Sequence, residues 1–313
     1  MMGENWFIGE CMLEMRPGQA DATFQVDAAG DTYNSAVYLK RLNPAVAVRY
    51  ISALGDDPVS HRIRSQIRAH GIDDTLVDTV AGSLPGLYLI ETDADGERRF
   101  HYWRQQSAAR RMLAPPQLAS LTAAAADCAC LVLSGISLAI LDPARRDSLL
   151  ALAATVRRGG GWVVIDNNFR PVLWPAAEAA SWLSRAMAVG THALLGFDDE
   201  AALYGDADAA ASIARLRGQH PELEIVIKCG AAGCVVAPAG VAPFTVAAQP
   251  AVVRDSTAAG DSFNAAYVAA RASGLGARAA AERGCQLAAR VVAHSGAIIP
   301  APAMADLCGP FSV

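Results

Sequence analysis

The sequence predicts an α/β protein: a mainly parallel sheet flanked by helices, with a small β-sheet lid. Short apolar runs alternate with longer segments of helical periodicity, which is the pattern of strands joined by helices. Several of these runs are apolar throughout, as expected of parallel strands that are buried on both faces. The chain has 313 residues, of which 53% are hydrophobic, so it can bury a large core.

The elements follow one another in a regular order along the chain. The strands of the large sheet are expected at 6–13, 46–54, 129–136, 162–166, 193–197 and 225–229. The helices that alternate with them are expected at 32–42, 58–70, 143–157, 207–217, 261–272 and 277–293. Helical connections of this length return the chain to the same edge of the sheet, so consecutive strands lie parallel.

Two regions depart from this alternation and predict the lid. The strand-like runs 87–92 and 98–104 are joined through 93–96, which ends in Asp95-Gly96, a favoured hairpin turn. The segment 12–26 is also strand-like and is interrupted by a Pro-Gly pair. We therefore expect a separate sheet from about 12–27 and 86–104. Because no linker or repeat divides the rest, residues 1–313 are expected to form a single domain.

Composition argues against several classes of partner. The net charge of -5 gives no general attraction for nucleic acid. The apolar stretch 128–141 is shorter than the roughly 20 residues that span a bilayer, and no signal peptide is recognisable at the N-terminus. The seven cysteines lie mostly in apolar runs and are expected to be reduced thiols. These observations predict a cytoplasmic protein that binds neither nucleic acid nor membrane.

One segment offers phosphoryl-transfer chemistry. No P-loop and no dinucleotide-binding glycine motif is present, which argues against those nucleotide-binding classes. The segment 255–261, Asp-Ser-Thr-Ala-Ala-Gly-Asp, lies between a strand-like run and a long helix. Its small residues allow the N–H groups of 258–261 to bind one anion at the helix start, beside the carboxylate of Asp261. Asp261 would then orient and deprotonate an attacking hydroxyl. The alternative is that Asp261 is an ordinary N-cap.

Four segments in this order and spacing resemble the ribokinase-like, or PfkB, family of carbohydrate kinases. They are 29–34, 51–57, 166–174 and 255–261. The resemblance covers nearly the whole chain and implies a Rossmann-like domain with a β lid, ATP and Mg²⁺ as cofactors, and transfer of a phosphoryl group to a sugar hydroxyl. The runs 9–12 and 102–104 are most similar to family members that phosphorylate the sugar acid 2-dehydro-3-deoxy-D-gluconate.

The resemblance assigns roles to individual residues. Asp261 would be the catalytic base, and Ala258, Ala259 and Gly260 would form the anion hole. The substrate would be bound by Gly30, Asp31, Asn34, Tyr88, Tyr102, Arg104 and Arg170. The nucleotide would lie near Lys228, Gly230, Gly233 and His294. Structural interpretations stay open for several of these residues: a helix cap for Asp31, turn positions for the two nucleotide-side glycines, packing for His294 and the tyrosines.

Two residues depart from the family pattern. The first glycine of the usual Gly-Ala-Gly-Asp motif is Ala258, which keeps the N–H donor but has less backbone freedom. The family's Asn-x-x-Glu element has Phe197 in place of its asparagine. Glu200 would still reach magnesium through water, an ion that commonly keeps several waters.

Arginines indicate the class of substrate. Arg104 ends a lid strand and Arg170 ends a sheet strand, so both can approach one pocket at the carboxyl ends of the strands. A guanidinium binds a carboxylate bidentately, and two buried guanidinium groups would be poorly paired without an anion, which favours a sugar acid. The other arginines of these regions are expected to be solvated: Arg98, Arg99, Arg110 and Arg111.

Three functions remain open at this point. The first is the sugar-acid kinase, the second a kinase of a neutral sugar such as fructose, tagatose or ribose, and the third a non-catalytic sugar- or nucleotide-binding protein on the same fold. The presence of Asp261 argues against the third. The lid is expected to have an apolar outer face that includes Phe24, Val26 and Trp103, which would make a homo-oligomer possible.

Overall fold

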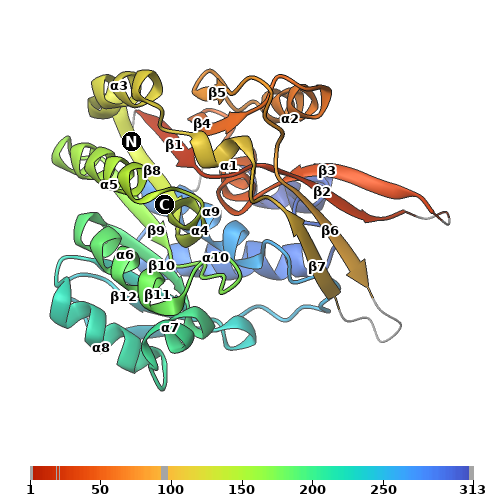
Figure 1. The fold of residues 1–313 in the computed structure, drawn as a ribbon. Helices are drawn as coiled ribbons and strands as arrows, with labels where there is room; N and C mark the ends of the chain where they lie inside the picture. Colours follow the sequence, from red (N-terminus) through yellow and green to blue (C-terminus); the bar gives the residue numbers. More distant parts are fainter. Residues whose placement is uncertain (1–2, 19, 21, 93–97, 310–313) are drawn as a thin grey trace.

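The computed structural model of the chain has two sheets, one large and layered between helices, the other small and projecting from it (Figure 1). It describes residues 3–18, 20, 22–92 and 98–309. The large sheet has nine strands in the order β13-β12-β11-β10-β9-β8-β1-β4-β5, and the lid has four in the order β3-β2-β6-β7. The pairings from β11 to β5 are parallel, and β12 and β13 add an antiparallel edge. This arrangement confirms the predicted fold class.

The bounds of the elements are as follows. The strands of the large sheet are β1 (Glu4–Ile8), β4 (Ala47–Leu54), β5 (Val77–Thr79), β8 (Cys128–Ser134), β9 (Trp162–Asp166), β10 (His192–Gly196), β11 (Glu224–Lys228), β12 (Cys234–Ala237) and β13 (Phe244–Val246). The lid strands are β2 (Met12–Pro17), β3 (Phe24–Ala29), β6 (Leu87–Thr92) and β7 (Arg98–Trp103). The helices are α1 (Asp31–Leu42), α2 (Pro58–Ala69), α3 (Pro115–Ala124), α4 (Gly135–Ala139), α5 (Pro143–Arg158), α6 (Ala176–Val189), α7 (Phe197–Tyr204), α8 (Ala209–Gln219), α9 (Ala259–Ala272) and α10 (Ala277–Val292). Short 3-10 helices are η1 (Ala108–Arg111), η2 (Ala125–Asp127), η3 (Gly230–Ala232) and η4 (Ala301–Leu307).

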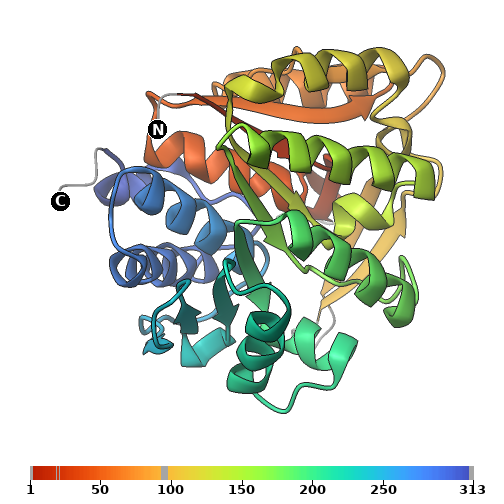
Figure 2. The same cartoon turned by 90° about the vertical axis from the view of Figure 1, so that its left-hand side faces the viewer.

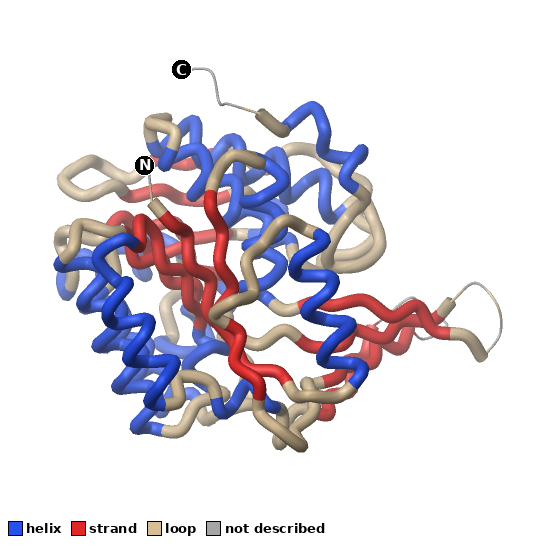
Figure 3. Tube along the Cα trace, turned by 90° about the horizontal axis from the view of Figure 1, so that it is seen from above, coloured by secondary structure: helices blue, strands red, loops and turns tan. Residues whose placement is uncertain are grey.

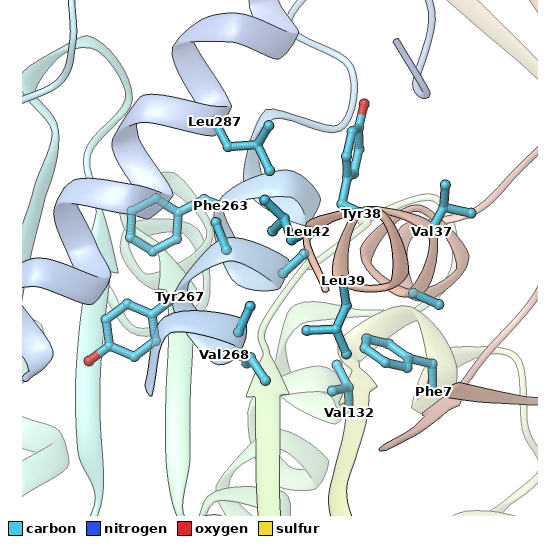
Figure 4. Close-up of a cluster of buried hydrophobic side chains, with 14 of the residues drawn as sticks. Phe7, Val37, Tyr38, Leu39, Leu42, Val132, Phe263, Tyr267, Val268 and Leu287 are labelled. Carbon is cyan, nitrogen blue, oxygen red and sulfur yellow. The ribbon is translucent and has the colours of Figure 1, made fainter. Parts of the chain in front are cut away.

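Alternating side chains of the large sheet fill two separate cores. On β8, Val132 packs toward α1, α9 and α10, whereas Leu131 and Leu133 pack toward α3, α5, α6 and α8. Figure 4 shows the first core, where Phe7 and Val132 meet side chains of α1 such as Leu39. Figure 2 faces the helices that cover the second core. Because both faces are covered, the strands are apolar on both sides, as their sequence predicts.

The lid leaves the large sheet directly after β1. The expected single strand at 6–13 is two strands: β1 ends at Ile8, the N–H of Gly9 donates to the carbonyl of Ile51, and β2 then begins at Met12. The apolar pattern runs through this junction, so it carries no sequence signal other than one glycine. Figures 1 and 3 show the lid strands extending as a ribbon beyond the layered body. The predicted turn at 93–96 lies outside the described residues.

The helices differ from the expectation at several places. Helices α3 and α4 lie in stretches for which no helix was predicted. Helix α6 falls in a stretch for which no helix was predicted, and α7 begins at Phe197, inside the element compared with the family's magnesium motif. Helix α9 begins at Ala259 rather than at Asp261. In the described residues no helix is long and apolar enough to cross a membrane.

Candidate active site

A cavity of about 1000 Å³ lies at the carboxyl ends of the strands of the large sheet, beneath the lid. Parallel sheets bind ligands at this edge, where the strand order reverses. In this sheet the order reverses between β1 and β8: β4 and β5 lie on one side of β1, and β8 to β11 lie on the other. Most of the predicted site residues line it: Gly30, Asp31, Asn34, Tyr88, Tyr102, Arg104, Arg170, Lys228, Ala258, Ala259, Gly260 and Asp261. The fold therefore brings together residues from five parts of the chain that are far apart in the sequence: 30–34, 88–104, 170, 228 and 258–261.

The start of α9 lines the cavity and contains the segment that was predicted to bind an anion. Ala258 is the N-terminal cap and has a left-handed backbone, with φ at +61°. The N–H of Ala259 donates weakly to Ser256 at 3.3 Å, and the N–H groups of Gly260 and Asp261 have no acceptor among the described residues. Free N–H groups in a first helical turn, together with the helix dipole, attract an anion.

Lys228 adds a positive charge to this helix start. A Cβ built on Gly260 would lie 3.3 Å from Nζ of Lys228, so the ammonium group is close to the first turn of α9. Nζ donates to Oδ2 of Asp166 at 2.9 Å and to Oδ1 of Asn264 at 3.1 Å. Lys228 ends β11 and thus reaches the cavity from the sheet.

The carboxyl group of Asp261 lies in the first turn of α9, half-buried at the cavity surface. Its Oδ2 accepts a hydrogen bond from Nδ2 of Asn34 at 2.8 Å. Burial and the nearby carboxylate of Asp31 raise the pKa of Asp261 to about 8, although the hydrogen bond from Asn34 opposes this. The helix begins two residues earlier, so the N-cap interpretation of Asp261 is wrong.

The start of α1 approaches the same carboxyl group. A Cβ on Gly30 would lie 2.1 Å from the carbonyl oxygen of Glu10, so only glycine permits this close approach. Asp31 is not the cap of α1, which is Gly30. Its Oδ2 accepts from Nδ2 of Asn168 at 2.8 Å, which connects α1 to the end of β9.

The two lid tyrosines both pack together and line the cavity. The ring centroids of Tyr88 and Tyr102 are 5.7 Å apart. The hydroxyl of Tyr88 donates to Glu14, a buried carboxyl of β2 whose pKa is raised by burial. Packing and contact with a ligand are therefore compatible interpretations of these two residues.

The expectation of two buried arginines without partners is wrong for both residues. Arg104 is buried, but its guanidinium forms an ion pair with the equally buried Glu10. Arg170 is exposed at the cavity surface and donates to the carbonyl of Phe169 at 2.8 Å. Nothing in the local sequence links Glu10 with Arg104, which are 94 positions apart.

Arg110 also lines the cavity, although nothing in the sequence indicates this. It was expected to be solvated, yet it is half-buried on η1 and lines the cavity. The following residue, Arg111, is exposed and is not in the cavity lining. A short run of arginines has no periodicity that separates an inward residue from an outward one, so the fold decides which of them faces the ligand.

The remaining nucleotide-side predictions lie outside the cavity lining. Gly230 and Gly233 belong to the turn around η3, and Gly233 has φ at +96° with no room for a Cβ beside the carbonyl of Val246. Nδ1 of His294 is 2.9 Å from the carbonyl oxygen of Arg290. The turn interpretation is thus accounted for at Gly233, and a nucleotide contact for these three residues stays a prediction.

Two acidic residues near the start of α7, Asp199 and Glu200, differ in whether they line the cavity. Glu200 is buried and its carboxylate accepts from Nδ2 of Asn167 at 3.0 Å and from Arg215, away from the cavity lining. Asp199, one residue earlier, lines the cavity with Asp166. Burial and the charge of Asp166 raise the pKa of Asp199. Among the described residues no three or more side chains of His, Cys, Asp or Glu are arranged so that they could hold one metal ion together.

The comparison with protein families is decisive for identity. The model of the pfkB family of carbohydrate kinases matches residues 2–304. This chain is a member of the pfkB family of carbohydrate kinases. A curated relative, the 2-dehydro-3-deoxygluconokinase of Escherichia coli strain K12, is 42% identical over 306 residues, covering 95% of this kinase and 97% of the relative.

Solved structures agree with the family assignment. The PfkB protein from Polaromonas sp. JS666 has a TM-score of 0.80 at 25% identity, covering 98% of this kinase and all of that chain. A putative ribokinase II from E. coli, solved with ATP and Mg²⁺, has a TM-score of 0.81 at 21% identity, covering 95% and 94% of the two chains. The second likeness shows the fold alone.

Proposed function

We propose that this kinase transfers the terminal phosphoryl group of ATP to 2-dehydro-3-deoxy-D-gluconate, giving the 6-phosphate. The observation that carries the proposal is the half-buried carboxyl group of Asp261 beside the free N–H groups of α9, on a cavity that also contains three arginines. The 42% identity to the E. coli 2-dehydro-3-deoxygluconokinase supports the same substrate.

Asp261 serves as the general base. Its carboxylate accepts the proton of the sugar's primary hydroxyl as that oxygen forms a bond to the terminal phosphorus, while the bond between that phosphorus and the ADP oxygen breaks. Asn34 orients the carboxylate through its 2.8 Å hydrogen bond. The N–H groups of 259–261 and the ammonium of Lys228 stabilise the charge on the transferred phosphoryl group.

The donor set near the anion hole fits a magnesium ion. Magnesium is commonly held by one or two carboxylates and several waters, and Asp166 and Asp199 are the cavity carboxylates that are not beside the attacking hydroxyl. These two residues would hold the ion with ATP, and it would neutralise charge on the phosphate oxygens. Glu200, bonded to Arg215, is then a residue that orients Asn167 rather than one in contact with the ion.

A panel assay tests this function. ATP consumption is measured with 2-dehydro-3-deoxygluconate, its galacto epimer, fructose, tagatose and ribose, with product identified by mass spectrometry. We expect the sugar acid to be phosphorylated with the highest kcat/KM. A neutral sugar with higher kcat/KM would favour the neutral-sugar kinase, and tight binding without any ATP consumption would favour a binding protein.

Two further parts of the proposal concern the environment of the kinase. We propose that the lid pairs with the lid of a second copy, since Phe24 and Trp103 are exposed on it. We also propose that the reaction takes place in the cytoplasm, which is in keeping with the use of ATP and with seven cysteines that are all free thiols.

A further inference from the structure

The cationic residues that line the cavity are not equivalent. In the described part of the chain these are Arg104, Arg110, Arg170 and Lys228. Arg104 is paired with Glu10 and Lys228 with Asp166, so their charges are already compensated. Neither Arg110 nor Arg170 forms an ion pair with any described residue. An anionic ligand is therefore expected to be attracted to Arg110 and Arg170 first.

The ion pair between Arg104 and Glu10 is buried, which disfavours its separation. The side chains are 6% and 1% exposed, and separating a buried pair leaves an uncompensated charge, which is strongly destabilising. Glu10 lies between β1 and β2, and Arg104 directly follows β7, so the ion pair joins the two ends of the lid. A substrate carboxylate would have to compete with Glu10 for Arg104. An uncharged hydroxyl or carbonyl oxygen could accept from it without breaking the pair.

Arg110 is held in a fixed position by its own element. The preceding residues of η1, Ala108 and Ala109, are 0% and 2% exposed, and the N–H of Ala108 donates to the carbonyl of Leu84 at 2.9 Å. The Cα of Arg110 is thus anchored while its side chain reaches the cavity. Its neighbour Arg111 reaches toward Oγ of Ser83 at 3.5 Å instead.

We propose that Arg110, together with Arg170, binds the carboxylate of the substrate and selects a sugar acid, whereas Glu10 positions Arg104 for a hydrogen bond to an uncharged oxygen. This inference rests on the proposed function. In that substrate the phosphorylated hydroxyl and the carboxylate lie at opposite ends of the carbon chain. Arg110 and Arg170 come from η1 and the segment after β9, whereas Asp261 comes from α9.

The test compares the sugar acid with a neutral analogue in which a hydroxymethyl group replaces the carboxylate. In Arg110→Gln, kcat/KM for the acid should fall about 30-fold or more, the usual effect of removing a charged hydrogen-bond partner, with the KM for ATP unchanged. The value for the neutral analogue should stay within about twofold. For Arg110→Lys, kcat/KM for the acid should lie between the values of the wild type and of Arg110→Gln, because lysine keeps the charge but loses the bidentate geometry. Arg111→Gln is the matched control and should leave both substrates unaffected.

A second variant separates the two roles. Glu10→Gln should lower kcat/KM for the acid and for the neutral analogue by a similar factor, because it loosens Arg104 without touching the carboxylate site. Glu224→Gln controls for the loss of a buried carboxylate. Glu224 begins β11, at the end of the strand opposite to Lys228, and its ion pair is with Arg271. An unchanged acid preference in Arg110→Gln, or a loss of that preference in Glu10→Gln, would overturn the inference.

Calorimetry of sugar binding distinguishes failure of this inference from failure of the proposed function. A wild-type protein that binds the acid but does not phosphorylate it contradicts the proposed function. The inference is then decided by binding alone: weakened binding of the acid in folded Arg110→Gln supports it, and unchanged binding overturns it. A wild-type protein that neither binds nor phosphorylates the acid overturns both.

Discussion

At the scale of single residues, the backbone at the start of α9 depends on local sequence, whereas the charges around it depend on contacts between distant segments. The run of small residues before Asp261 encodes a backbone feature, so the motif alone locates the N–H groups and the carboxyl group. The neutralisation of Arg104 by Glu10 depends on contact between two distant segments. The inward position of Arg110 depends on the packing of η1. No local pattern contains either fact.

Asp261→Asn should lower kcat by a factor of about 10² to 10⁴, the usual contribution of a positioned base, and leave ATP binding intact. Because the pKa of Asp261 is raised to about 8, kcat/KM of the wild-type enzyme should rise with pH as this group loses its proton. Steady-state kinetics across pH 6 to 9, at roughly 0.5-unit steps around that pKa, would measure both effects. Turnover near the wild-type value, or a pH dependence retained by the variant, would contradict the assignment of the base.

The same substitution tests the electrostatic environment of the site. The folded protein binds the Asp261 proton up to about pH 8, whereas the unfolded chain releases it near its ordinary pKa of about 4. Over that window the stability contributed by this group falls as pH rises. Asp261→Asn should therefore be more stable than the wild type at pH 8, by a margin that shrinks toward pH 4. Thermal unfolding at both pH values measures this difference.

Ala258→Gly should stabilise the fold by about 1 kcal/mol or less. At φ +61° alanine is strained by roughly 1–2 kcal/mol, and the extra freedom that glycine gives the unfolded chain offsets part of that gain. Ala259→Gly is the matched control: it lies in the first turn of α9 and should destabilise by up to about 1 kcal/mol. Urea unfolding of the two variants measures both changes in stability. A lower free energy of unfolding for Ala258→Gly than for the wild type would contradict the prediction that Ala258 is strained.

At the scale of elements, regular strands and helices were predictable, and junctions were not. β9 matches its expected range because its apolar run follows three glycines, 159–161, and ends at Asp166. The break between β1 and β2 was missed because the residues on both sides of it are apolar. The two strands separate because they pair with different segments: the N–H of Gly9 donates to the carbonyl of Ile51, whereas Met12 pairs with Ala29 of β3. Helix α6 was missed although its buried residues Ala179, Leu183 and Ala186 recur at helical spacing.

The lid should become less mobile when substrate binds. Tyr88 on β6 and Tyr102 on β7 line the cavity, so a bound sugar adds contacts that hold both strands. Hydrogen exchange of amides in β6 and β7 should slow with saturating sugar acid, whereas amides of β11, in the middle of the large sheet, should exchange as before. Equal exchange in the lid with and without the substrate would mean that it is a fixed structural element.

At the scale of the whole molecule, the lid has two faces of different character. The face that lines the cavity carries Met12, Tyr88 and Tyr102. The opposite face carries the alternating residues of the same strands, among them Trp103, which pairs with Leu87, and Val26, which pairs with Met15. We propose that residues 1–313 act as one folding unit in which this second face is left for another copy of the chain.

Trp103→Glu should convert a dimer into monomers. Trp103 is 57% exposed and Phe24 is 50% exposed, and apolar patches of this kind on a soluble domain usually mark an interface. A charge introduced at the centre of such an interface would have to be buried without a partner, which typically costs several kcal/mol. Sedimentation velocity at micromolar concentration should show a dimer for the wild type and a monomer for Trp103→Glu. Val241→Glu is the control, because Val241 is 51% exposed and lies between β12 and β13, at one edge of the large sheet. A monomeric wild type, or dissociation caused equally by both variants, would exclude pairing through the lid.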